Sequence, residues 1–169
     1  MNRLLIGNIV TLFGSSLNAI SGLIKDKRKT IIIQIVIFSI FALGNLILGG
    51  ISGFISNAIS ILRNIVCLRF NFTWVFKLAF LESQGVMTLV FSTEGIAAIL
   101  PFIAVAVYVL VLDTKNPIIF KASISLSQVF WLLYDFTISN YTGVIFDVVS
   151  LITNCIALYQ LIKGESHTG

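Results

Sequence analysis

Charged residues are scarce in this sequence. Asp, Glu, Lys and Arg make up 11% of the 169 residues, while 57% are hydrophobic and the mean hydropathy is +1.03. So few charges could not cover the surface of a soluble domain of this size. We therefore expect an integral membrane protein. Only Arg3 precedes the first apolar run, and no small-residue cleavage site ends that run. We expect it to be a permanent span and not a cleaved signal peptide.

Residues that build metal sites, disulfides and helix kinks are also few. The one histidine, His167, lies in a polar tail with no other ligand near it in sequence, so no metal site or other cofactor is expected. Cys67 and Cys155 fall within apolar runs, which favours packed thiols over a disulfide. Of the two prolines, only Pro101 lies in the middle of an apolar run. No Ser–His, Cys–His or phosphate-loop constellation is present, so we do not expect an enzyme.

Apolar runs of about the 20 residues needed to cross a bilayer recur along the whole chain. They predict seven spans, at about residues 4–24, 30–48, 51–68, 74–91, 96–112, 118–136 and 144–162. Arg3 falls on one side of this topology, and nine other basic residues fall on the opposite side: Lys25, Lys27, Arg28, Lys29, Arg69, Lys77, Lys115, Lys121 and Lys163. The positive-inside rule then predicts an outside amino terminus and a cytoplasmic carboxyl terminus in a plasma membrane.

The net charge of +4 needs no nucleic-acid partner, because the cations would sit beside membrane lipid. The run "KDKRK" is explained as a topology determinant, although recruitment of a partner is an alternative interpretation. We expect the partners to be membrane lipid and a small solute, and coupling to a proton is left open. Homo-oligomerisation is left open by the sequence.

A repeat emerges when the sequence is shifted by 90 residues, and no gap is needed between residues 41–70 and 131–160. Only 6 of those 30 positions are identical, so the polar matches carry the weight. In the third span Gly53, Asn57, Ser60 and Asn64 follow spacings of four, three and four, which place them on one helix face. The same stripe in the seventh span consists of Gly143, Asp147, Ser150 and Asn154.

Two similar units joined by one extra span must have the same orientation in the membrane. The sequence therefore predicts an all-α membrane protein of seven helices in a 3+1+3 arrangement. Residues 1–70 would form the first three-helix repeat, residues 71–93 the linker helix and residues 94–169 the second repeat. Unsatisfied polar groups are costly in lipid, so both stripes should face the interior. Close helix packing is the alternative explanation for the serines and for Asn64 and Asn154.

The aromatic and polar residues of the repeat carry a resemblance to a known superfamily. "WLLY" supplies Trp131 and Tyr134, the sixteenth residue after the tryptophan is Asp147, and the first repeat has Phe41 and Asn57 in matching places. This pattern resembles the SWEET and SemiSWEET sugar facilitators, PQ-loop proteins and PnuC vitamin transporters. Within that superfamily the chain looks most like the YgjV-type bacterial inner-membrane proteins, through "SNAISILRNIVCLR" and the start of the last two spans.

The resemblance implies that Phe41, Asn57, Trp131 and Asp147 flank a central pocket, with Asn64 and Asn154 deeper along the stripes. An aromatic face and a carboxylate suit a cationic or multiply hydroxylated solute, or a proton as co-substrate. An interfacial belt residue is the alternative interpretation of Trp131.

Three further residues near the predicted outer surface are candidates for an external gate: Tyr134, Asp135 and Tyr141. Loop polarity explains them about as well. In the third span Arg63 is expected to pair with Glu82 of the linker as a structural ion pair, with snorkelling or an anionic substrate as alternatives.

A facilitator or secondary transporter for a small polar solute, sugar-like or vitamin- or nucleoside-like, ranks first among the functions. A non-transporting receptor or regulatory binding protein of the same fold is the alternative.

Overall fold

A computed structural model describes residues 2–21, 27–70, 73–111, 114 and 116–163. These residues form seven α-helices and one short 3₁₀ helix, and no strand occurs among them. The helices are α1 (Arg3–Ser21), α2 (Lys27–Leu48), α3 (Ile51–Arg69), α4 (Trp74–Phe91), η1 (Gly95–Ala98), α5 (Ile99–Val111), α6 (Pro117–Thr137) and α7 (Tyr141–Ile162). The all-α class and the seven helices predicted from the sequence are therefore confirmed, with most boundaries within a few residues.

Local chemistry explains where several helices begin. Pro117 occupies the first turn of α6, and the Asn116 side chain accepts hydrogen bonds from the backbone N–H groups of Ile118 and Ile119. Asn140 accepts from the backbone N–H of Gly143 at 3.1 Å, which explains why α7 begins three residues before the predicted Val144.

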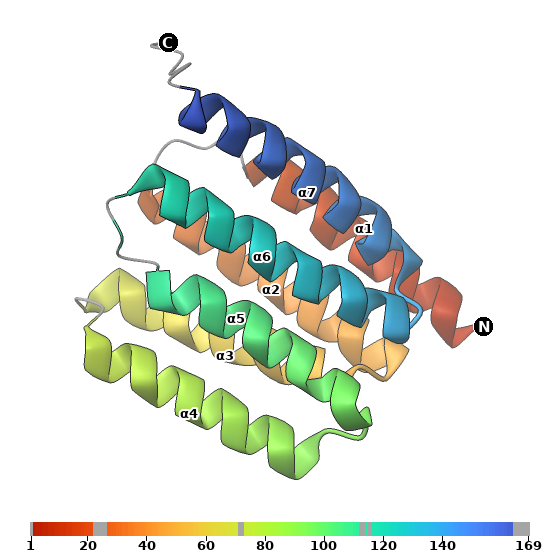
Figure 1. Cartoon of the computed structure of the whole chain (residues 1–169). Helices are drawn as coiled ribbons and strands as arrows, with labels where there is room; N and C mark the ends of the chain where they lie inside the picture. The colour runs from red at the N-terminus through yellow and green to blue at the C-terminus, as the bar shows by residue number, and fades with distance from the viewer. Residues whose placement is uncertain (1, 22–26, 71–72, 112–113, 115, 164–169) are drawn as a thin grey trace.

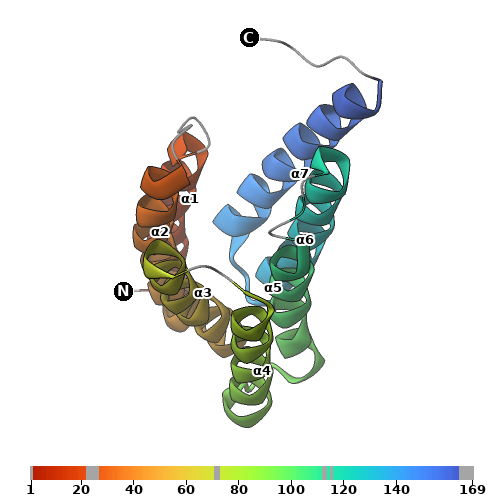
Figure 2. The same ribbon diagram turned by 90° about the vertical axis from the view of Figure 1, so that its left-hand side faces the viewer.

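The helices pack as two sets with α4 at one edge. In the first set α2 packs against both α1 and α3, and in the second α6 packs against both α5 and α7. The sets meet where α3 contacts α5 and where α1 contacts α7, and α4 contacts both α3 and α5 (Figure 1). Viewed from the side, the first set lies opposite the second with α4 at their junction, and α7 leads away from α1 toward the C-terminal end (Figure 2).

The distribution of side chains is the reverse of that in a water-soluble protein. Fourteen of the described buried residues are polar or charged, against ten that are hydrophobic, and many large hydrophobic side chains are exposed. Leu89 on α4 is 81% exposed, whereas Gln84 on the same helix is 0% exposed. An apolar exterior around a polar interior is the arrangement that a lipid environment favours.

Four helices are long and apolar enough, by length and composition, to cross a membrane. Within the described residues these spans are Ile31–Leu48, Ile51–Arg69, Trp74–Phe91 and Tyr141–Gln160, and Gly95–Val111 is a shorter apolar segment. The chain therefore has the properties of a membrane protein with several spanning helices.

The α2–α3 and α6–α7 connections share one backbone geometry at positions 90 residues apart. Gly49 and Ser139 both have positive φ, at 89° and 60°. The N–H of Gly50 bonds to the carbonyl of Asn45 at 2.8 Å, and the N–H of Asn140 bonds to that of Asp135 at 2.9 Å. A second pair of bonds, Gly49 to Leu46 and Ser139 to Phe136, measures 3.2 and 3.3 Å. The structure thus repeats the turn at the spacing that the polar stripes suggested.

Candidate functional site

Four residues from three separate segments meet at one end of the helices, and we call them the Glu94 cluster: Ser52 and Gly53 of α3, Glu94 before η1, and Tyr134 of α6. Oε1 of Glu94 accepts from the Ser52 N–H at 2.9 Å, the Ser52 hydroxyl at 3.0 Å and the Tyr134 hydroxyl at 3.0 Å. The Tyr134 oxygen also accepts from the Gly53 N–H at 2.8 Å. These bonds join the start of α3 to the end of α6. Tyr134 is 0% exposed, so its hydroxyl depends on them for its hydrogen-bond partners.

Small residues make room for the Tyr134 ring. A Cβ atom on Gly50 would lie 2.4 Å from the Tyr134 hydroxyl oxygen, and one on Gly53 would lie 2.6 Å from its ring. Both distances are far below normal van der Waals contact. The glycines at the start of α3 are therefore required by the close approach of α6.

A second contact between the two helix sets lies at the same end. Oδ1 of Asn8 on α1 accepts from the backbone N–H of Thr142 on α7 at 2.9 Å, and its Nδ2 donates to the Ser139 carbonyl at 3.1 Å. Nearby, Asp135 is 7% exposed and accepts from Asn140 at 3.0 Å. The two sets are thus tied together at this end, which we call the joined end, by contacts between α3 and α6 and between α1 and α7.

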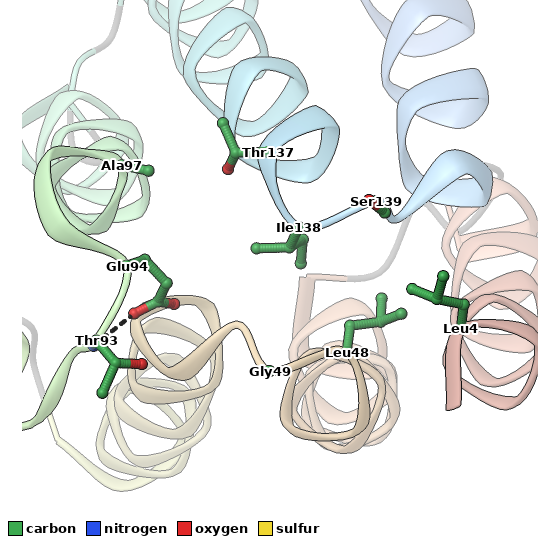
Figure 3. Close-up of a pocket in the computed structure, with 9 residues that line it drawn as sticks. All are labelled: Leu4, Leu48, Gly49, Thr93, Glu94, Ala97, Thr137, Ile138 and Ser139. Atoms are coloured by element: carbon green, nitrogen blue, oxygen red, sulfur yellow. Dashed lines mark hydrogen bonds between the residues drawn. The ribbon is translucent and has the colours of Figure 1, made fainter. Parts of the chain in front are cut away.

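A pocket of about 450 Å³ lies where the connections of this end converge. Figure 3 shows that Glu94 and Thr93, Gly49 with Leu48, and Ile138 with Ser139 approach it from three different connections. The pocket is open, and it borders the Glu94 cluster because Glu94 is one of the residues that line it. None of the four residues predicted to flank a central pocket lines it, so that central pocket stays a prediction.

Asp147 has one satisfied and one unsatisfied carboxylate oxygen. Its Oδ1 accepts a hydrogen bond from Gln128 on α6, while its Oδ2 is enclosed and has no partner. Three residues along α6 from Gln128, Trp131 is only partly exposed and meets the Tyr134 ring edge-on, with centroids 6.0 Å apart. Gln128, Trp131 and Tyr134 therefore form a continuous strip along α6, with Asp147 of α7 bonded at one end of it.

Arg63 lies inside the protein and not at its surface. It is 4% exposed, its guanidinium donates through Nε and Nη2 to Oδ1 of Asn64 at 3.3 and 3.2 Å, and it lies 5.5 Å from the centroid of the Tyr108 ring. The ion pair predicted with Glu82 is not formed, because Glu82 is exposed on α4. Spacing along the sequence does not show that Arg63 points toward Tyr108 of α5.

The two repeat-related asparagines each contact the middle helix of their own set. Asn64 donates to Oε1 of Gln34 on α2 at 3.2 Å, and Asn154 accepts from Lys121 on α6 at 3.3 Å. Asn57 is buried and donates to the Gly53 carbonyl of its own helix at 2.9 Å. Phe41 packs against Gly14 of α1, where a Cβ would lie 2.7 Å from its ring. The described contacts do not join Phe41 or Asn57 to Trp131 or Asp147, so a single pocket shared by all four stays a prediction.

A scan of the chain against known families gives one decisive result: residues 5–165 match the model of Imp-YgjV, described as a bacterial inner membrane protein. The chain belongs to this family. No curated protein and no solved structure matches this Imp-YgjV chain. Membership and the apolar helices together identify a protein of the bacterial inner membrane.

Two residues of this Imp-YgjV protein that make site contacts, Glu94 and Gln128, are not among the residues that the sequence predicts for the site. Glu94 has no periodic pattern around it, and an acid beside the predicted outer surface is the one sequence signal at that position. Gln128 is a polar side chain in the middle of an apolar run, which is a stronger signal because amides are costly in lipid. Of the predicted gate residues, Tyr134 and Asp135 are buried at the joined end and Tyr141 is 59% exposed.

Proposed function

We propose that this Imp-YgjV protein is a facilitator or secondary transporter that moves a small polar solute between its two helix sets. The observation that carries the proposal is the polar interior of α3. Its buried side chains include Ser52, Ser56, Asn57, Ser60, Arg63 and Asn64, which extend from the Glu94 cluster through most of the helix. A helix that only holds others together in lipid does not need a carboxylate partner, amides and a guanidinium along one face.

The 3+1+3 arrangement is part of this proposal. The 90-residue correspondence of the two turns supports parallel repeats, with α1–α3 and α5–α7 as the repeated units and α4 as the linker. Parallel repeats around an axis along the membrane normal occur in transporters that bind their solute between the two units. The likeness to the SWEET and PQ-loop superfamily belongs to the same hypothesis.

We infer the orientation from charge. Among the described basic residues predicted on the cytoplasmic side, Arg69 at the end of α3 and Lys163 after α7 lie at helix ends opposite the Glu94 cluster. The joined end then faces the periplasm, and the protein adopts a state that is closed on the outside. A solute would leave or enter from the cytoplasmic side in this state.

Asp147 and Trp131 are the proposed contacts in the outer half of the pathway. The enclosed, unpartnered Oδ2 of Asp147 supports a role for this carboxylate, because a buried acceptor without a donor is costly unless a proton or a solute hydroxyl satisfies it. The Trp131 ring offers an apolar face to a sugar or nucleoside ring.

Flux through proteoliposomes tests the proposal. Purified protein would be reconstituted and supplied with radiolabelled sugars, nucleosides, vitamins and small organic acids, with empty liposomes as the control. Solute entry above that control, saturable and blocked by excess unlabelled solute, is the expected result. Saturable binding to the purified protein without entry would instead support a receptor, and neither binding nor entry for any class would contradict both functions.

Orientation needs a separate measurement. Single cysteines would replace Ser139 at the joined end and Lys163 at the opposite end, in a protein whose two native cysteines have been changed to serine. We expect an impermeant maleimide added to intact cells to label the Ser139→Cys protein and not the Lys163→Cys protein. The opposite labelling pattern would reverse the proposed orientation.

A further inference from the structure

The strongest unexplained feature outside the strip formed by Gln128, Trp131, Tyr134 and Asp147 is the guanidinium of Arg63. Arg63 follows Ile51 by twelve residues, which at about 1.5 Å per residue places it roughly 18 Å along α3 from the joined end. It is 4% exposed, so its charge does not reach a helix end or the bulk solvent. A cation held at this depth needs a compensating group.

No carboxylate compensates this charge within the described chain. Among the described residues, the one acceptor for the Arg63 guanidinium is the amide oxygen of Asn64, which is neutral, and the Tyr108 ring supplies a weaker cation–π contact at 5.5 Å. Glu82, the acid that sequence spacing suggested, is exposed on α4. Within the described residues the guanidinium therefore contacts a neutral amide and an aromatic ring and has no counter-ion.

Part of the guanidinium is also free to bind. Of its five N–H groups, one on Nε and one on Nη2 are directed at Asn64, which leaves three without an acceptor among the described residues. The described atoms that are enclosed without a partner belong to Gln84, Thr88 and Asp147, so the unbonded Nη1 of Arg63 is not sealed by protein. An edge with two N–H groups side by side matches the two oxygens of a carboxylate or phosphate.

Neighbouring contacts hold this edge in place. Asn64 is itself 4% exposed, and it donates to Oε1 of Gln34 at 3.2 Å while accepting from Arg63. Gln34 lies on α2 and Tyr108 on α5, so the guanidinium is fixed by residues from both helix sets. A pre-positioned guanidinium loses little side-chain entropy on binding an anion.

We propose that Arg63 binds the anionic group of the solute, a carboxylate or a phosphate, between α3 and α5. This inference rests on the proposed transport function, because it names the solute that is transported. Binding of an anion at Arg63 can nevertheless be measured whether or not the protein transports a solute. It narrows the solute to a small organic acid or a phosphate ester, with Asp147 available nearer the joined end for a hydroxyl group or a proton.

Thermal stability of the purified protein in a neutral detergent, without added lipid, provides the binding assay. Succinate and inorganic phosphate are titrated at constant ionic strength against chloride, with glucose as a neutral probe. The expected result is a saturable rise of the unfolding midpoint with at least one anion and none with glucose. If succinate acts and phosphate does not, the group recognised is a carboxylate, and the reverse result identifies a phosphate. No rise with either anion would overturn the proposal.

Two variants assign the effect to Arg63. Arg63→Gln should weaken anion binding at least tenfold, whereas Arg69→Gln, at an exposed basic residue of the same helix, should leave it unchanged. Equal affinity in the wild type and in Arg63→Gln would overturn the assignment. Should Arg63→Gln fail to fold, Asn64→Asp keeps the guanidinium and gives it an internal counter-ion. This variant should melt higher than the wild type without ligand and should lose the response to anions, and an unchanged response would overturn the proposal.

Flux separates this inference from the proposed function. Anion binding that depends on Arg63, with no flux in proteoliposomes, would support the site and contradict transport. Flux of a neutral solute that is unchanged in Arg63→Gln would support transport and contradict the anion site.

Discussion

The phenol oxygen of Tyr134 lies 2.8 Å from the backbone nitrogen of Gly53 and 3.0 Å from Oε1 of Glu94. One side chain of α6 therefore bonds both to the first turn of α3 and to the segment that follows α4. Alternating access requires that the two helix sets separate at one end while they stay joined at the other. If the protein is the transporter proposed above, the Glu94 cluster is where its joined end has to open.

Replacing Tyr134 by phenylalanine should weaken the joined end without altering its shape. The change removes the hydroxyl that donates to Glu94 and accepts from Gly53, and each lost hydrogen bond is worth about 1 kcal/mol. We expect the free energy of unfolding to fall by roughly 1–3 kcal/mol, measured by denaturant titration in detergent. Tyr141→Phe is the control, because Tyr141 is 59% exposed. Equal stability of the two variants would show that the Glu94 cluster does not hold the helix sets together.

Alanine at Gly143 should be more disruptive than alanine at other helical glycines. A Cβ there would lie 1.8 Å from Oδ2 of Asp135, and one at Gly53, the matching position of the first repeat, would lie 2.6 Å from the Tyr134 ring. Overpacking of this kind costs about 1–3 kcal/mol. At Gly85 the nearest atom would be 3.4 Å away, so Gly85→Ala should be neutral or stabilising through its helix propensity. Melting temperatures of the three variants check this, and a loss at Gly85 as large as at Gly143 would contradict the close-packing argument.

Much of this fold could be predicted because a helix that crosses a membrane needs a long apolar run, and the basic residues between such runs mark the connections. The seven helices follow from run length, and the start of α3 follows from the Gly49–Gly50 pair. The start of α7 could not be predicted in this way. Ser139 adopts a positive φ that its residue type does not suggest, and Asn140 caps the helix through a side-chain hydrogen bond.

The candidate site was harder to predict, since contacts between helices depend on their rotation as well as on sequence spacing. The 90-residue shift aligned Asn57 with Asp147, yet Asn57 bonds to its own helix and Asp147 bonds to Gln128 of α6. Glu94 joins Tyr134 across 40 residues, and no periodic pattern relates the two. Periodicity therefore identifies which residues share a helix face, but the partner on the next helix has to come from the structure.

Glu82 should be dispensable for stability, although the sequence suggested that it pairs with Arg63. Glu82 is exposed, and it forms no ion pair with Arg63 in the described chain, so Glu82→Gln should change the free energy of unfolding by less than about 0.5 kcal/mol. Because the two side chains share no contact, Glu82→Gln and Arg63→Gln should have additive effects in a double-mutant cycle. A coupling energy above about 1 kcal/mol would restore the ion pair that the structure lacks.

Asp147→Asn tests whether the proposed transport needs the charge of this carboxylate or only its shape and its hydrogen bond to Gln128. An asparagine at this position keeps an oxygen that can accept from Gln128, and it keeps the shape of the side chain. Expression and melting temperature should therefore change little. It removes the ionisable group at this point of α7, so under the proposed function uptake in proteoliposomes should fall at least tenfold, and any pH dependence of uptake that comes from this carboxylate should disappear.

Ser150→Ala is the matched control for this variant, because Ser150 lies three residues further along the same helix face and carries no charge. Its uptake should retain the pH profile of the wild type. The first repeat already has an amide, Asn57, at the position that matches Asp147, so an amide alone is compatible with the fold. If Asp147→Asn transports normally at every pH, the carboxylate serves only to hold Gln128 and the solute contacts lie elsewhere, with the guanidinium of Arg63 as the next residue to test.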